Sequence, residues 1–291
     1  ITTSGGAGVG GAADGAGGEI RFGSDVVNDS LVLATDTVVM DAGANSADII
    51  FNTTIEVPAG LTLTSGITGD IEFNGVVGAN TVVGQVQINE ARNVDVNQNF
   101  TSTGFNQATS GVGTFTVAAD ATLTTTTNPL TIDSETVTLN GNLRTNAGVD
   151  GGLVDQGQID INAGVGGLTQ AVDTTITSTS TTPGTASGAI DIDSDGDVAL
   201  NGSVISTGAD NNNGAGGAGG AINIDATGAS TITVNGEITS SGGDATHNVN
   251  AGGNAGNITF NTDDTNIVLT QATITAAGGA NNGAAAPGNG G

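Results

Sequence analysis

A five-residue pattern, Gly-x-(Ile/Val/Phe)-x-(Ile/Phe/Val), recurs along almost the whole chain and limits what the chain can fold into. In each copy apolar residues alternate with polar ones, which is typical of a short β-strand with one buried face. Recurrence at intervals of tens of residues indicates a stacked repeat architecture. The copies span residues 18–22, 69–73, 84–88, 113–117, 157–161, 188–192, 220–224 and 256–260, with weaker matches at 47–51 and 128–132.

In the second half of the chain, two further strand patterns follow each copy in a fixed order. One unit reads Gly188-Ala-Ile-Asp-Ile192, then Asp197-Val-Ala-Leu-Asn-Gly202, then Ser203-Val-Ile-Ser-Thr-Gly208. We therefore predict an all-β parallel β-helix (β-solenoid) with three short strands per coil and roughly 30 residues per coil there. An antiparallel sandwich or barrel is the alternative. Antiparallel hairpins, however, do not require that three strand patterns recur in the same order. Shorter spacings in the first half leave open that some copies are second strands.

Asn-Gly pairs at Asn140, Asn201 and Asn235 separate the second and third strand patterns. Both residue types accept positive φ, so we expect the chain to turn a corner there. The alternation also predicts which strand residues face inward and which face solvent. The inward set is Ile71, Phe73, Ile159, Ile161, Ile190, Ile192, Ile222, Ile224, Ile258 and Phe260, and the outward acids are Asp70, Glu72, Asp160 and Asp191.

The charge of the chain excludes several functions. Against 29 acidic residues there are three arginines, Arg21, Arg92 and Arg144, and no lysine, which gives a net charge of −26. Nucleic acids and anionic membrane surfaces would be repelled, because both require basic partners. No apolar run is long enough to span a bilayer, so we expect no membrane insertion. Without cysteine, no disulfide can hold the fold together.

Glycine is concentrated in inserts at residues 5–18, 208–220, 242–256 and 278–291 of a predicted single solenoid covering 1–291. Such composition normally predicts flexible loops. The alternative is a ladder, because inserts on consecutive coils would lie over one another. All four follow a third-strand pattern, so we predict that Ile1, Thr2, Thr3 and Ser4 stack on Ala272, Thr273, Ile274 and Thr275 of a neighbouring copy. This assembly would be a head-to-tail homopolymer.

Candidate chemistry is sparse. Residues 191–196 read Asp-Ile-Asp-Ser-Asp-Gly, the opening of a calcium loop, and Asp193, Asp195 and Asp197 are candidate ligands for turn-bound calcium. The twelfth position is Gly202, which excludes an EF-hand. A strand with outward acids that ends in an Asp-Gly turn explains the same residues.

We predict no catalytic residues and no cofactor other than this calcium. A polysaccharide-degrading enzyme would need clustered acids with a cation, and the only histidine, His247, lies in a Gly/Asn-rich loop. Threonines at 122–127 and 174–182 raise ice binding as a further alternative. We do not expect their rows to repeat from coil to coil.

The Gly-x-Ile-x-Ile strand and the Leu-Asn-Gly-x-Ile-x-(Ser/Thr)-x-Gly continuation resemble the β-helical passengers of filamentous-haemagglutinin-like and autotransporter adhesins, over about residues 18–291. The resemblance implies an extracellular protein at the cell surface. Since the chain begins with Ile, we expect a processed product or a segment of a longer protein. Our first expectation is a non-catalytic filament or matrix subunit, with a host or neighbouring-cell surface as a further partner. The alternative is a stalk segment of a large secreted adhesin.

Overall fold

The computed structural model describes residues 1–2, 18–23, 30–32, 36–43, 47–107, 111–146, 157–246, 250–263, 265–281 and 287–291. These residues form 25 strands and no helix, so the described chain holds no helix that could cross a membrane. Twenty-three strands belong to one sheet, while β2 and β5 pair with each other. Neighbouring strands pair in parallel, as in β17–β20 and β20–β23. The predicted all-β class with repeated parallel strands is confirmed.

The pairings group the strands into three ladders. The first contains β3 (Val38–Asp41), β6 (Leu61–Gly66), β8 (Val83–Ala91), the second half of β10 (Phe100–Gln107), the first halves of β13 (Leu130–Leu139) and β15 (Ile159–Gln170), β17 (Ile190–Ser194), β20 (Ile222–Ala226) and β23 (Ile258–Thr262). The second contains β1 (Ile20–Phe22), β4 (Ile49–Phe51), β7 (Ile71–Phe73), β9 (Val94–Val96), β11 (Gly111–Val117), the second halves of β13 and β15, β18 (Val198–Leu200), β21 (Ile232–Val234) and β24 (Ile267–Leu269).

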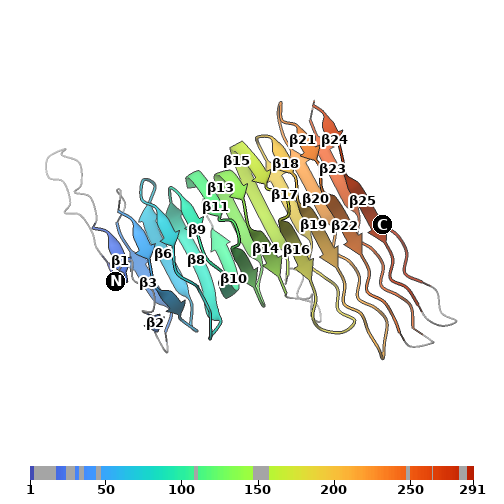
Figure 1. Cartoon of the computed structure of the whole chain (residues 1–291), viewed down its shortest axis with the longest axis horizontal. Helices are drawn as coiled ribbons and strands as arrows, with labels where there is room; N and C mark the ends of the chain where they lie inside the picture. The colour runs from blue at the N-terminus through green and yellow to red at the C-terminus, as the bar shows by residue number, and fades with distance from the viewer. Residues whose placement is uncertain are drawn as a thin grey trace.

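The third ladder contains β2 (Ser30–Val32), β5 (Thr54–Glu56), the first half of β10, β12 (Thr122–Thr125), β14 (Asn142–Thr145), β16 (Thr175–Thr179), β19 (Ser203–Thr207), β22 (Glu237–Ser241) and β25 (Thr273–Ala277). Single bridges at Val77 join β5 to β10. The chain passes through the first, second and third ladders in turn and then returns to the first. Figure 1 shows the strands side by side from β1 at one end to β25 at the other, an arrangement compatible with a β-solenoid.

The recurring pattern occupies two ladders rather than one. Copies at 84–88, 157–161, 188–192, 220–224 and 256–260 lie in the first ladder, whereas those at 18–22, 69–73 and 113–117 lie in the second. The two groups share a pattern because both ladders bury one face of the strand. This placement explains the shorter spacings in the first half of the chain.

The predicted inward side chains form the core. Ile190 pairs with Ile222 and Ile222 with Ile258, so identical side chains stack along the first ladder. The predicted inward residues from Ile71 to Ile224 are at most 1% exposed, while Ile258 and Phe260 are partly buried at the end of the stack. One feature of this core was not predicted. Six phenylalanines in the first half make a continuous chain of ring contacts: Phe22, Phe51, Phe73, Phe100, Phe105 and Phe115.

The Asn-Gly corners occur where predicted, but their physical reason is different. None of the glycines after Asn140, Asn201 and Asn235 has positive φ. Instead, a Cβ at Gly236 would overlap the backbone carbonyl oxygen of Gly202 one repeat earlier. Glycine is therefore required because successive corners approach closely. The asparagines join the repeats, since Asn235 Nδ2 donates a hydrogen bond of 2.7 Å to Asn201 Oδ1.

The glycine-rich inserts of the second half form a hydrogen-bonded array beside the ladders. Donors and acceptors alternate between the outgoing and returning limbs of successive inserts: Gly217 N to Ala209 O, Gly243 N to Gly217 O, Gly253 N to Gly243 O, Gly279 N to Gly253 O and Gly288 N to Gly279 O, all 2.8–2.9 Å. Figure 1 shows these segments extending together from the ends of β19, β22 and β25. The predicted stacking of consecutive inserts is confirmed for the described parts of 208–220, 242–256 and 278–291.

Candidate functional site

The outer face of the first ladder carries two rows of acids and amides. Asp160 pairs with Asp191, and Asp193 pairs with Asp225. Together with Asp133 and Glu135 from β13, several of these side chains line an open groove. The rows arise because the same outward positions carry Asp or Asn in successive copies of the pattern. This concentrates negative charge on one face.

The carboxylates in these rows raise one another's pKa. Partial burial raises the pKa of Asp160, and the neighbouring carboxylates of Asp191, Asp193 and Asp133 raise it further. Asp193 is exposed, but neighbouring atoms partly desolvate its carboxylate, and this desolvation together with Asp191 and Asp225 raises its pKa. These are the shifts expected where like charges stack on a half-buried surface.

The predicted calcium ligands do not converge on one point. Asp193, Asp195 and Asp197 are all exposed, at alternate positions along one stretch of chain. Asp195 Oδ1 accepts a hydrogen bond of 2.8 Å from Thr227 Oγ1, and Asp197 Oδ1 accepts one of 2.7 Å from Thr231 N. Within the described ranges, no group of three or more His, Cys, Asp or Glu side chains could hold a metal ion. The carboxylates of Asp195 and Asp197 instead bond to the next repeat along the stacking direction.

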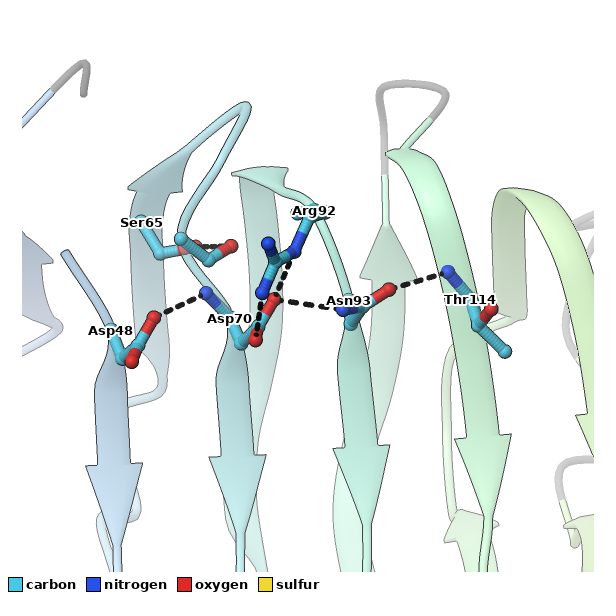
Figure 2. Close-up of polar contacts among 7 residues, drawn as sticks. Asp48, Ser65, Asp70, Arg92, Asn93 and Thr114 are labelled. Atoms are coloured by element: carbon cyan, nitrogen blue, oxygen red, sulfur yellow. Dashed lines mark hydrogen bonds and ion pairs between the residues drawn. The ribbon is translucent and has the colours of Figure 1, made fainter. Parts of the chain in front are cut away.

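A related polar row precedes the second-ladder strands of the first half. Asp48 Oδ1 accepts from Asp70 N, Asp70 Oδ1 accepts from Asn93 Nδ2, and Asn93 Oδ1 accepts from Thr114 N, at 2.8–2.9 Å. Figure 2 shows this succession, with Arg92 above Asp70. The Arg92 guanidinium pairs with the Asp70 carboxylate at 2.5 and 2.9 Å. Asp48 and Asn93 bond to the backbone of the next repeat, and Asp70 bonds to the side chain of Asn93, so the row joins successive repeats.

The end of the structure at β23, β24 and β25 is open. Ile267, Leu269 and Ile274 are 42%, 51% and 42% exposed, whereas their partners Ile232, Val234 and Ile238 in the preceding strands are fully buried. These side chains occupy inward-type positions, and they meet solvent because no strand of the described chain lies over them. This end contains the predicted assembly residues Ala272, Thr273, Ile274 and Thr275.

The other predicted assembly segment lies in an unexpected ladder. Ile1 O accepts from Asp41 N at 2.9 Å, and Thr2 forms a parallel bridge to Asp41 of β3. Ile1 and Thr2 thus adjoin the first ladder, whereas β25 belongs to the third, so these two residues do not occupy the third-strand position on which the predicted stacking of residues 1–4 on 272–275 was based. The sequence Ile-Thr-Thr-Ser matched third strands only by local pattern. Thr3, Ser4 and most of the insert at 5–18 lie outside the described residues, as does His247.

The third ladder presents an outer face of a different kind. Paired positions place Thr101, Thr124, Arg144, Thr177, Ile205, Thr239 and Thr275 in one row. A second row contains Thr179, Thr207, Ser241 and Ala277. Arg144 and Ile205 interrupt the first row and Ala277 ends the second, so the threonines do not repeat on every strand, as expected from the sequence. The interruptions of the first row lie on β14 and β19, where Arg144 and Ile205 hold the positions that threonine holds on the other strands.

Comparison with protein-family models, with curated proteins and with solved structures finds no match.

Proposed function

We propose that the three ladders are the faces of a parallel β-solenoid with three strands per coil. Each coil in the second half of the chain would contain roughly 30 residues. We further propose that the protein is a non-catalytic extracellular subunit of a surface filament or matrix, joined end to end. The observation that carries this proposal is the open end at β24 and β25, where inward-type side chains are about half exposed. Exposed apolar surface of this kind favours association.

Backbone groups at this end support the same proposal. Thr273 N donates to Gly236 O, and Ala277 O accepts from Gly242 N, so these residues of β25 bond to the preceding repeat. In a parallel ladder alternate residues bond to opposite neighbours. Ile274 and Ala276 therefore direct their backbone groups away from β22, where a further parallel strand would pair with them.

The distribution of charge also favours the approach of a second copy at the end formed by β23, β24 and β25. Thr259 and Asn261 of β23 occupy the positions held by Asp191 and Asp193 two repeats earlier. Thr273 likewise pairs with Glu237. Because the terminal strands replace acids with neutral residues, a second copy of a chain with net charge −26 meets less repulsion there than along the sides.

Sedimentation velocity over a range of concentrations tests the proposal. We expect species larger than the 27.9 kDa chain, and filaments by electron microscopy. Leu269→Lys places a charge on the open end, and Ala276→Pro removes an outward N–H, so both variants should remain monomeric. Val172→Lys, at a side position that is 67% exposed, is the matched control and should assemble normally. A wild-type chain that stays monomeric at every concentration would overturn the proposal.

The alternative is a stalk segment of a larger adhesin. Gly220 and Gly256 each stand two residues before a first-ladder strand, β20 and β23 respectively. Gly291 lies over Gly256 in the same way that Gly256 lies over Gly220. The same open end would then be covered by a further repeat of the same polypeptide. The intact mass of the native material separates the two: a discrete chain supports the filament subunit, and a much longer polypeptide supports the stalk.

A further inference from the structure

The corner that follows the second ladder carries asparagine in most repeats. The residues directly after β4, β7, β9, β11, β13, β15, β18, β21 and β24 are Asn52, Asn74, Asn97, Ala118, Asn140, Ala171, Asn201, Asn235 and Thr270. The backbone N–H of each bonds to a carbonyl of the preceding repeat, as Asn140 N does to Val117 O at 2.9 Å. These residues therefore hold one position that repeats along the stack, which we call the corner row.

Four members of the corner row are followed by glycine: Asn74, Asn140, Asn201 and Asn235. In water an asparagine before glycine readily loses its side-chain amide, because glycine has no Cβ to hinder attack of its own nitrogen on the asparagine Cγ. The reaction also needs an asparagine side chain that is free to turn toward the main chain. Since the four pairs are the same dipeptide, their surroundings decide which of them can react.

Hydrogen bonds between repeats restrain three of these four side chains. Asn74 Nδ2 donates to Asn52 Oδ1 at 3.0 Å. Asn235 Nδ2 donates to Asn201 Oδ1 at 2.7 Å, and Asn201 Nδ2 donates to Gln170 O at 2.9 Å. The three side chains are also partly buried. Each must break its hydrogen bonds before its Cγ can meet the nitrogen of the following glycine.

Asn140 lacks this restraint. The corner row holds Ala118 one repeat before it and Ala171 one repeat after it, so neither neighbour offers a polar side chain. Asn140 is the exposed member of the four, and its side chain makes no hydrogen bond within the described part of the chain. The backbone N–H of Gly141 donates no hydrogen bond there either. At this corner, both groups that would react are therefore free of hydrogen bonds.

We infer that Asn140 is a site of spontaneous deamidation. Gly141 N loses its proton to hydroxide and attacks Asn140 Cγ, so that a C–N bond forms. The bond from Cγ to Nδ2 then breaks, and the nitrogen leaves as ammonia with a proton from water. Water opens the resulting cyclic imide at either carbonyl, which gives aspartate or isoaspartate at residue 140. The net reaction hydrolyses the amide to a carboxylic acid and ammonia, and it does not depend on end-to-end assembly.

The isoaspartate product would lengthen the main chain at a corner that has little spare room. A Cβ at Gly141 would overlap the backbone carbonyl oxygens of Ala118 and Ala121. The bond of 2.9 Å from Asn142 N to Ala121 O fixes the backbone immediately after this glycine. Isoaspartate should therefore loosen the corner before β14, whereas aspartate leaves the length of the main chain unchanged.

Peptide mapping of the full chain by mass spectrometry, after incubation at mildly alkaline pH, tests the inference. In the folded wild type, Asn140 should deamidate at least about tenfold faster than Asn201 and Asn235, which must first break hydrogen bonds. The three rates should become similar when the chain is unfolded in urea. Asn213, which is exposed in an insert and precedes Gly214, is the internal reference and should react in both states.

Two variants exchange the restraint between corners. Ala118→Asn supplies Asn140 with the neighbour that Asn201 provides for Asn235, so it should slow the reaction at Asn140. Asn201→Ala removes that neighbour and should speed the reaction at Asn235, while the rate at Asn74 stays unchanged. Circular dichroism should show that both variants are folded. If Asn140 reacts no faster than Asn201 and Asn235 in the folded wild type, or if both folded variants leave the rates unchanged, the inference is overturned.

Discussion

Asp160 of β15 pairs directly with Asp191 of β17 on the outer face of the first ladder, and the second carboxylate helps to raise the pKa of the first. Burial is the larger cause of the shift. Like charges at directly paired positions of a sheet destabilise the folded state. Repulsion between paired carboxylates on the outer face of the first ladder therefore opposes folding at neutral pH.

This pairing predicts how stability depends on pH. Asp160, Asp193, Asp133 and Asp95 all have a raised pKa in the folded state. The native chain then binds protons at a pH where the unfolded chain does not, so the free energy of unfolding should rise as pH falls from neutral through the raised pKa values. The rise should stop near the ordinary aspartate pKa of about 3.9.

Urea unfolding midpoints between about pH 7 and pH 4 measure this effect. Asp160→Asn should increase stability at pH 7 by about 0.2–1 kcal/mol and reduce the pH dependence. The exposed Asp36→Asn is the control and should change neither. A stability that falls steadily on acidification over this range would contradict the prediction.

The inward register gives a second prediction. Ile222→Asp places an unpartnered charge among fully buried side chains and should cost at least about 3 kcal/mol. The same change at Ile258 should cost less, because that side chain is only partly buried. Asn223→Ile changes an outward position and should leave thermal unfolding close to wild type. The opposite ranking of Ile222→Asp and Asn223→Ile would show that the register is reversed.

Local pattern was sufficient for the strand faces but not for the pairing between strands. The alternation in Gly188-Ala-Ile-Asp-Ile192 predicted correctly that Ile190 and Ile192 face inward, because side-chain direction in a strand depends only on its period of two. The ladder to which a copy belongs depends on which strand lies next to it. Residues 69–73 match the pattern as well as 188–192 do, yet they lie in the second ladder.

The candidate surfaces depend on the same long-range information. Asp193, Asp195 and Asp197 resemble a calcium loop in sequence, but hydrogen bonds to Thr227 and Thr231 of the next repeat direct two of these carboxylates elsewhere. The threonine rows likewise appear only when strands of different spacing are aligned. A comparison of every second residue across the predicted third strands is the signal that could have found them.

Calcium provides a third prediction. Because Asp193, Asp195 and Asp197 do not form a metal-binding group, calcium should act on self-association only by screening the net charge of −26. Light scattering should then rise equally with CaCl₂ and NaCl at matched ionic strength, and EDTA should have no further effect. Stoichiometric calcium binding by calorimetry that is lost in Asp195→Asn would contradict this prediction.

The glycine-rich array provides the last prediction, which concerns order in segments whose composition predicts flexibility. Amides of Gly243, Gly253 and Gly279 are hydrogen-bonded between the limbs of the inserts, so they should exchange slowly with solvent deuterium. A Cβ at Gly253 would overlap the backbone carbonyl of Gly217, which cannot move aside without opening the array. Gly253→Ala should therefore abolish protection in the inserts while the strands remain protected. Gly214→Ala is the matched control, because the nearest atom to its Cβ is the movable side-chain Nδ2 of Asn211. Rapid exchange of these amides in the wild type, or equal effects of the two substitutions by mass spectrometry, would show that the inserts are not held by backbone packing.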